Sequence, residues 1–279
     1  MFHMAKLKKQ HMTIHWKAIV QDDSSIPATE ATLKEKATLV GRVGLMMLSV
    51  GTGAWRVRNS MNKVARCLGI TCTADIGLLA ISYTCIEGTD TYTQSISNPT
   101  TGVNTHKLME LELFMKEFPD KVSTYSVKHI HDVLDEIQKL PANYKAWNLG
   151  LASALACGAF TFLLGGGPVE MCCAFLGAGV GNFVRKKMLG HSISLLANVA
   201  VSVAASCLVY VLTILLAQSL LSVSAVHQAG YICAMLFVIP GFPLITGGID
   251  LAKLDLRSGL ERVSYALLII LTATMTGWA

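Results

Sequence analysis

Charged residues are scarce in this chain, and the scarcity is concentrated in its second half. Only 15% of the 279 residues are charged; residues 1–145 hold 17 of the 23 lysines and arginines, and residues 146–279 hold 6. Soluble domains carry about a quarter charged residues, so the second half does not have the composition of a soluble fold. This balance predicts a flexible tail over residues 1–28, a soluble domain over 29–145 and a membrane domain over 146–279.

The sequence also lacks the motifs of common enzymes. There is no Gly-x-Ser-x-Gly and no His-Glu-x-x-His, and the glycine run at 165–168 lacks the lysine and the Ser or Thr of a phosphate-binding loop. The net charge of +5 is not concentrated as in a nucleic-acid-binding surface. We therefore expect no enzymatic activity, no cofactor and no nucleic-acid partner.

Metal-binding patterns are missing as well. The eight cysteines include no Cys-x-x-Cys, which favours reduced, buried thiols and a reducing cytosolic environment for the soluble half. His3, His11 and His15 have no acidic or cysteine neighbour, so we interpret the tail as a basic segment that touches anionic lipid and not as a metal site. The tail has no apolar segment of the kind found in signal peptides.

The first part of the soluble half has the signals of two helices. Thr32-x-x-Glu35 is a capping box, which predicts the start of a helix, and Gly51-Thr52-Gly53 predicts its end. A second helix with an apolar face comes next and is expected to stop at Gly69, because glycine readily adopts the left-handed conformation that ends helices.

The rest of the soluble half predicts a small antiparallel sheet and two more helices. Residues 74–98 are rich in threonine and alternate as strands, with a turn at 87–90. The result is an α+β domain large enough to bury its own core. The first of the two further helices is expected to start at Asn104 and to end before Pro119. The second is expected to start at Ser123 or Ser126 and to end at Pro141.

Five apolar segments complete the chain, and we expect each to be a transmembrane helix of an all-α membrane domain. A bilayer needs about 17 or more apolar residues in a helix. Gly177 and Gly181 in the second segment form a face for close helix contact. The segments lie at about 147–164, 169–184, 192–217, 229–250 and 259–278.

The fourth segment is interrupted by Pro240, Gly241 and Pro243. Proline removes a backbone donor and clashes with the preceding turn, so the helix must bend or break. Lipid cannot satisfy the freed carbonyl, and broken backbone persists at membrane depth only where protein or a water-filled cavity covers it. Transporters build substrate sites from such discontinuous helices. We therefore predict a broken fourth helix that lines a solute path.

The basic loops predict the orientation in the membrane. Arg185-Lys186-Lys187 comes after the second segment, and Lys253, Arg257 and Arg262 lie around the junction of the fourth and fifth, whereas the loops at 165–168 and 218–228 have no lysine or arginine. Basic loops remain cytoplasmic. The soluble domain and the N-terminus are thus expected in the cytoplasm and the C-terminus outside, in a multi-pass membrane protein.

Ionisable residues in membrane segments are costly and therefore candidates for function. Asp250 lies just after the proline break, where it would couple a proton to transport or bind a substrate amine. Glu170 begins the second segment and is either part of an outer gate or an interfacial carboxylate in water. Asp255 and Arg257 contribute to transport or only pair with each other near the cytoplasmic surface.

The third segment has a polar side. It is formed by Asn198 together with Ser202, Ser206 and Gln218. Two interpretations fit this pattern equally well: a lining of the substrate path, or hydrogen bonds that join neighbouring helices.

Three stretches resemble the threonine/serine exporter family. Gly53-Ala54-Trp55-Arg56-Val57 is similar to the family's Gly-Ala-x-x-x-Arg-Val helix, allowing a shorter spacing between Ala and Arg, and Gly102–His106 resembles the start of its third soluble helix. Pro240-Gly241-Phe242-Pro243-Leu244 and the residues up to Arg262 resemble its Pro-Gly-x-Pro-Leu signature and the stretch just after it. Arg58 stands where many members carry an acidic residue. The likeness covers residues from about 30 to the end.

This resemblance implies an exporter of small polar metabolites in the bacterial inner membrane. The chain reaches Ala279 without the second membrane unit of the family's long members. It therefore resembles the larger subunit of the two-component branch, whose partner is a small membrane protein of about four helices. That branch is associated with succinate export and the fused branch with threonine and serine. A homo-oligomer is a further possibility.

The sequence thus favours a proton-coupled exporter subunit in which Asp250 is the coupling residue. One alternative is a non-transporting membrane scaffold or sensor whose cytoplasmic domain binds a ligand, and another is a channel. Asp250→Asn separates the first two, because a transporter should lose efflux while a scaffold should not respond.

Overall fold

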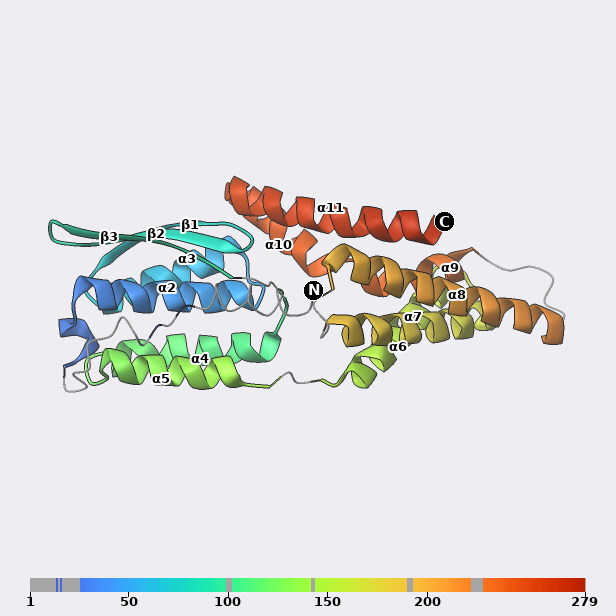
Figure 1. The fold of residues 1–279 in the computed structure, drawn as a ribbon, viewed down its shortest axis with the longest axis horizontal. Helices are drawn as coiled ribbons and strands as arrows, with labels where there is room; N and C mark the ends of the chain where they lie inside the picture. The colour runs from blue at the N-terminus through green and yellow to red at the C-terminus, as the bar shows by residue number, and fades with distance from the viewer. Residues whose placement is uncertain are drawn as a thin grey trace. The chain divides into compact units, whose positions relative to one another are not determined.

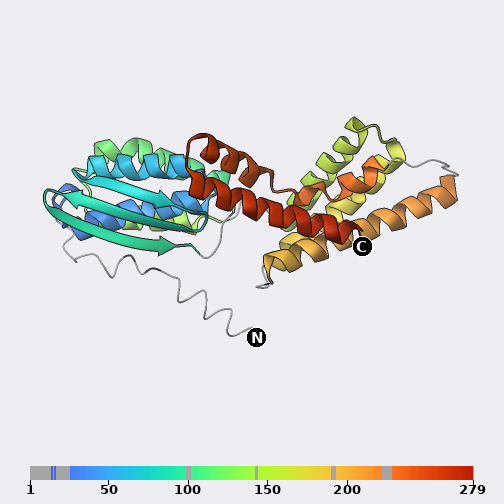
Figure 2. The same cartoon turned by 90° about the horizontal axis from the view of Figure 1, so that it is seen from above.

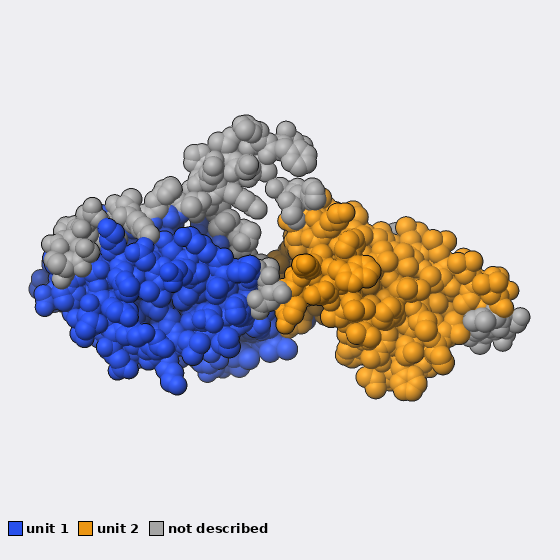
Figure 3. Space-filling model, turned by 90° about the horizontal axis from the view of Figure 1, so that it is seen from below, with its two compact units in different colours: residues 1–142, 242–263 blue, residues 143–241, 264–279 orange. Residues whose placement is uncertain are grey.

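The computed structural model describes Ile14, Trp16 and residues 26–98, 102–141, 144–189, 193–221 and 228–278. The chain divides into two compact units, coloured separately in Figure 3. Unit 1 consists of residues 1–142 and 242–263, and unit 2 of residues 143–241 and 264–279. Most of the predicted tail, including His3, His11 and His15, lies outside the described residues. Unit 1 takes in residues 242–263, which the sequence places in the membrane domain.

Unit 1 has three layers. Helices α2 and α3 pack between the sheet on one side and α4 and α5 on the other (Figure 1). The strands lie side by side in the order β1-β2-β3, all antiparallel (Figure 2). The elements are η2 (Ala28–Glu30), α2 (Leu33–Ser49), α3 (Ala54–Cys67), β1 (Thr71–Ile76), β2 (Ala80–Glu87), β3 (Asp90–Ser97), α4 (Thr105–Lys121) and α5 (Val127–Lys139).

The predicted start of α2 and end of α3 are confirmed. The Thr32 side chain accepts the Glu35 N–H at 3.4 Å, and the Glu35 carboxylate accepts the Thr32 N–H at 3.1 Å. This reciprocal pair satisfies two of the donors that a helix start leaves unpaired. Gly69 has a φ of +73°, which a residue with a side chain rarely adopts.

The sheet buries only one face. Ile81, Tyr83 and Cys85 of β2 point inward and are buried, whereas Ser82 and Thr84 on the other face bond to serine and threonine of β3. This alternation places the inward residues against α2. Gly41 of α2 makes room for Tyr83, because a Cβ at Gly41 would lie 2.1 Å from the Tyr83 hydroxyl.

Three predicted boundaries in unit 1 were wrong or are now resolved. Strand β1 begins at Thr71 rather than near residue 74, because Cys72 pairs in register with Cys85. Helix α4 runs past Pro119 to Lys121, since proline removes only one hydrogen bond and the Val122 N–H still bonds to the Phe118 carbonyl at 3.0 Å. Ser126, not Ser123, caps α5.

Unit 2 is made of helices. Helix α7 packs against both α6 and α8. Gly177 and Gly181 lie at this contact as predicted, since a Cβ at Gly181 would come within 2.7 Å of Ser206. The elements wholly in unit 2 are α6 (Ala146–Leu163), α7 (Pro168–Leu189), α8 (Leu195–Leu221), α9 (Ala229–Ala234) and η3 (Leu236–Val238); α10 (Gly241–Ala252) and α11 (Leu256–Trp278) have parts in both units.

Two described helices are long and apolar enough to cross a membrane, Ala146–Leu163 and Leu195–Leu220. Ala229–Val238 and Gly241–Ala252 reach this standard only together, as one broken span. Two or three spans are therefore shown, and the predicted five stay a prediction.

The predicted break in the fourth segment is present at Ile239–Pro240. Pro243 does not contribute to it, contrary to prediction. It lies in the first turn of α10, where backbone N–H groups have no partner within the helix, so its missing donor breaks no hydrogen bond.

Candidate functional site

A buried ion pair lies at the centre of the candidate site in unit 1. Asp250, on α10, is 0% exposed, and Arg262, on α11, is 2% exposed. The Arg262 Nε lies 3.2 Å from an Asp250 carboxylate oxygen. Ser258 lies between them: its hydroxyl donates to Asp250 at 2.9 Å and accepts from the Arg262 Nε at 3.1 Å. Each charge therefore has a partner of opposite sign and a hydrogen bond.

The Asp250 carboxylate also caps α3. Both of its oxygens accept the Ala54 N–H, at 3.0 and 3.1 Å. Gly53 stands at the N-cap position and has no side chain that could accept a bond from the helix. Helix N-termini carry a partial positive charge and unpaired N–H groups, so a carboxylate there is stabilised. Asp250 supplies from α10 the cap that α3 lacks.

Arg262 extends the connection to the loop before α3. Its Nη2 donates to the Thr52 carbonyl at 2.8 Å and its Nη1 to the Gly51 carbonyl at 3.5 Å. A buried pair of this kind contributes little net stability compared with apolar residues, but removal of one partner leaves an uncompensated charge. The pair therefore holds α10 and α11 in one specific position against the start of α3.

Two glycines make this contact possible. A Cβ at Gly53 would lie 2.9 Å from the Asp250 Oδ1. Gly51 has a φ of +92°, and a Cβ there would lie 2.9 Å from the Gly102 carbonyl oxygen. A side chain at either position would push apart groups that are now in direct contact.

The three stretches that resemble the exporter family meet here. Gly53–Val57 forms the start of α3, and Asp250 and Arg262 contact it from the third stretch. The second stretch adjoins them, because the Asn104 N–H donates to the Val50 carbonyl at 3.3 Å. Segments separated by about fifty to two hundred residues thus converge on the loop at 50–54.

A second set of ion pairs surrounds this contact. Asp255 accepts two hydrogen bonds from Arg58, at 3.0 and 2.6 Å, and this pairing raises the pKa of Arg58. Arg257 pairs with Asp75 and Glu261. The expectation that Asp255 and Arg257 pair with each other was wrong, because arginine and carboxylate partners from α3 and β1 lie closer.

Glu170 and Asn198 belong to unit 2, whereas the residues of this cluster belong to unit 1. Glu170 is 5% exposed, so it is buried within the unit and not an interfacial carboxylate in water. Asn198 is 1% exposed and donates to the Arg185 carbonyl at 3.2 Å. Ser206 donates to the Ala234 carbonyl at 2.7 Å, a hydrogen bond between helices as one interpretation predicted.

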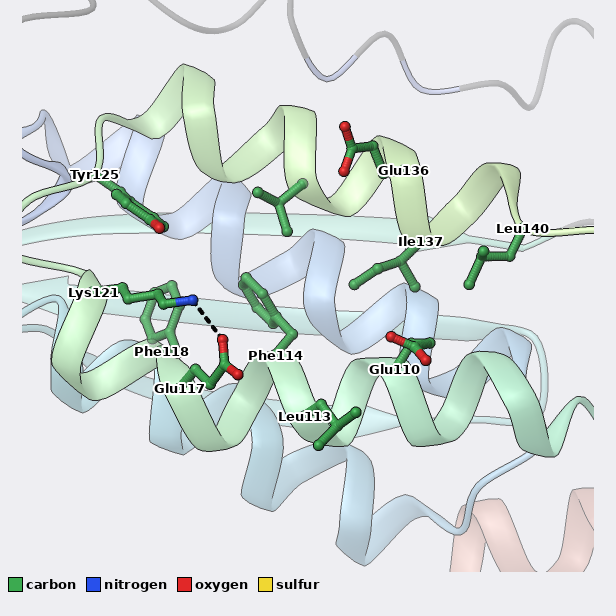
Figure 4. Close-up of a pocket in the computed structure, with 11 residues that line it drawn as sticks. Glu110, Leu113, Phe114, Glu117, Phe118, Lys121, Tyr125, Glu136, Ile137 and Leu140 are labelled. Carbon is green, nitrogen blue, oxygen red and sulfur yellow. Dashed lines mark hydrogen bonds and ion pairs between the residues drawn. The ribbon is translucent and has the colours of Figure 1, made fainter.

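Sequence reasoning missed two features. It did not predict that Asp250 caps α3, although Gly53 is a helix start without a side chain and signals a cap from elsewhere. It also did not predict a groove of about 390 Å³ between α4 and α5 in unit 1 (Figure 4). Its floor is apolar, and its rim carries Glu110, Glu136 and the pair Glu117–Lys121, joined at 2.5 Å. Exposed apolar positions on α4, such as Leu113, belong to this groove.

Among the described residues, no group of three or more His, Cys, Asp or Glu side chains is arranged to hold a metal ion. The hydrogen bonds of the candidate site connect α3, α10 and α11.

Comparisons with known proteins agree with the resemblance of the three stretches. The family model described as "Putative threonine/serine exporter" matches residues 38–279. The chain is 26% identical over 236 residues to the "Probable succinate transporter subunit YjjP" of Klebsiella aerogenes, covering 84% of this chain and 87% of that protein. It is 25% identical over 235 residues to the protein of the same name from Escherichia coli K12, covering 84% and 88%. No solved structure matches the chain. Because the family model spans most of the sequence, including all three converging stretches, the chain belongs to the threonine/serine exporter family.

Proposed function

We propose that the chain is the larger subunit of an inner-membrane exporter of small polar metabolites, with succinate-like dicarboxylates or threonine and serine as substrates. Family membership and the transporter-subunit names of two relatives support this proposal. The second subunit would be a small membrane protein of about four helices, as in the two-component branch that the sequence resembles. Five spans, a cytoplasmic N-terminus and an external C-terminus complete the proposed topology.

The buried Asp250–Arg262 pair is the observation that carries the mechanism. Charges are expensive to bury, and nothing in membrane anchoring requires a carboxylate that is 0% exposed. A proton on Asp250 would cancel the charge that holds both Arg262 and the α3 N-terminus. Proton uptake would then release α10 and α11 from α3, and proton loss would restore the contact. In this proposal Asp250 couples proton movement to export.

Metabolite efflux from cells tests the proposed function. Cells that lack the gene and regain it together with its partner subunit should release succinate, threonine or serine about tenfold faster than cells with an empty vector, a rate ratio that corresponds to about 1.4 kcal/mol. The release should continue when the external concentration exceeds the internal one, which a channel cannot sustain. Equal release of all three compounds from both strains would contradict the proposal.

The groove between α4 and α5 favours a second candidate function. A concave site with an apolar floor and a few charged groups is the usual form of a small-molecule site. The chain would then act as a sensor whose soluble domain binds a ligand. The same efflux measurement decides between the two, because a sensor without transport would not move solute against a gradient.

A further inference from the structure

The helix break in unit 2 leaves one backbone carbonyl without a backbone donor. In η3 the Val238 N–H bonds to the Met235 carbonyl at 3.2 Å, and the Ile239 N–H to the Leu236 carbonyl at 3.1 Å. The next bond in this series would join residue 240 to the Phe237 carbonyl, but Pro240 has no N–H. The Gly241 N–H bonds to the Ile239 carbonyl instead, at 2.9 Å. The Phe237 carbonyl must therefore find its donor elsewhere.

Arg185 provides that donor. Its Nη1 donates to the Phe237 carbonyl at 3.1 Å, and both residues belong to unit 2. The Arg185 side chain comes from the last turns of α7 and is partly buried. Within the described residues this is the one hydrogen bond that its guanidinium makes, and no carboxylate pairs with it. A guanidinium has five N–H donors, so most of them remain without a protein acceptor.

The other arginines differ from Arg185 in this respect. Arg257 and Arg262 already pair with carboxylates in unit 1. So do Arg42, Arg56 and Arg58, whereas Arg66 is an exposed residue of α3. In the part of the chain that the structure describes, Arg185 is thus the partly buried arginine whose charge is not balanced by a carboxylate.

A second polar group with unused bonding capacity adjoins Arg185. The Asn198 side chain donates to the Arg185 backbone carbonyl at 3.2 Å. Its own carbonyl oxygen is buried and has no donor among the described residues. If the Asn198 amide were turned the other way, its oxygen would face the Arg185 carbonyl oxygen, and two acceptors cannot bond to each other. The hydrogen bond therefore fixes the orientation of the amide. A buried acceptor without a donor costs free energy until a ligand or water supplies one.

We propose that Arg185 binds the carboxylate of the exported metabolite at the helix break. The planar fork of a guanidinium matches a carboxylate with two parallel hydrogen bonds. The Asn198 oxygen would accept from a hydroxyl, ammonium or carboxylic-acid proton of the same molecule. This inference rests on the proposed export function and assigns a residue to the carboxylate that all the proposed substrates share.

Succinate binding to the full chain with its partner subunit tests this assignment. Arg185→Gln removes the charge, Arg185→Lys keeps the charge but removes the fork, and Lys186→Gln removes the neighbouring exposed charge as a control. Affinity is measured by calorimetry with succinate, with threonine, and with succinamide as a ligand that has no carboxylate. We expect Arg185→Gln to weaken succinate binding about tenfold or more, or about 1.4 kcal/mol. Arg185→Lys should lie between wild type and Arg185→Gln, and Lys186→Gln should bind as wild type.

The outcomes separate this inference from the proposed function. If wild type exports carboxylates and both Arg185 variants bind and export them equally well, the Arg185 assignment is overturned and the export function stands. If wild type neither binds nor exports any carboxylate, both are overturned. Arg185→Lys keeps the test decisive where Arg185→Gln fails to fold, because a lysine retains a donor for the Phe237 carbonyl. Binding of succinamide as tight as that of succinate would also overturn the assignment.

Discussion

Replacing Asp250 by alanine is expected to lower the free energy of unfolding by about 3–5 kcal/mol, because Arg262 stays buried without its charge partner. Arg262 is 2% exposed, so water cannot replace the lost carboxylate without a rearrangement. The Ala54 N–H at the start of α3 and the Ser258 hydroxyl lose their acceptor at the same time. The loss should therefore exceed that of an ordinary surface ion pair several-fold.

Denaturant unfolding of the full chain in detergent, followed by tryptophan fluorescence, measures this loss. Asp255→Ala is the matched control, since it breaks the neighbouring Arg58 pair, whose arginine side chain is 34% exposed. That control should cost less than Asp250→Ala, because water reaches the partly exposed Arg58 side chain and replaces part of the lost interaction. The double variant Asp250→Ala, Arg262→Met should regain much of the stability, because it removes both charges. Similar losses of stability for Asp250→Ala and Asp255→Ala would contradict a special contribution of the buried Asp250–Arg262 pair.

Gly53→Ala is expected to cost about 1–3 kcal/mol, as overpacking of a filled interior usually does. The added Cβ would lie 2.9 Å from the Asp250 Oδ1. The end of a side chain normally moves aside at little cost, but this carboxylate is held by Ala54, Ser258 and Arg262. It can move only by breaking those bonds. Gly102→Ala is the control, because a Cβ at Gly102 meets no atom within 4 Å.

A double-mutant cycle shows whether the two residues act together. Once Asp250 is alanine, the Cβ at residue 53 no longer meets a carboxylate, and the nearest remaining group is the Trp55 ring, at 3.2 Å. Gly53→Ala should then cost less. Residues in direct contact show coupling energies of about 0.5–3 kcal/mol, whereas independent sites add. An equal cost of Gly53→Ala with and without Asp250 would mean that the glycine is needed for another reason.

The local signals of the sequence predicted much of unit 1. The capping box at Thr32–Glu35, the turn at Gly88 and the cap Asn104 depend on neighbouring residues alone, and each was confirmed. Of the two predicted caps of α5, the structure has Ser126. The break at Pro240 was predictable for the same reason, since the missing donor belongs to the proline itself. Pro243 was misjudged because the effect of a proline depends on its position in the helix, which the sequence did not determine.

The partners of the site residues were not predictable. Asp250 and Ala54 are 196 positions apart, and no periodicity relates them. The same holds for Arg58 and Asp255, which the sequence analysis did not connect. The resemblance to the exporter family marked both stretches without showing that they touch. Only the fold places the buried carboxylate at the start of α3 and the Arg185 guanidinium at the Phe237 carbonyl.

Efflux by charge-neutral variants tests most directly whether Asp250 couples protons to export. Asp250→Asn with Arg262→Gln removes both charges while keeping polar groups of similar size, so the variant should reach the membrane and bind the partner subunit as wild type does. Cells with this variant are compared with wild-type cells for release of the exported metabolite against a gradient. If Asp250 couples protons to export, release by this variant falls to the level of the empty vector. Release at the wild-type rate would show that the pair only holds the helices together and that protons are coupled elsewhere.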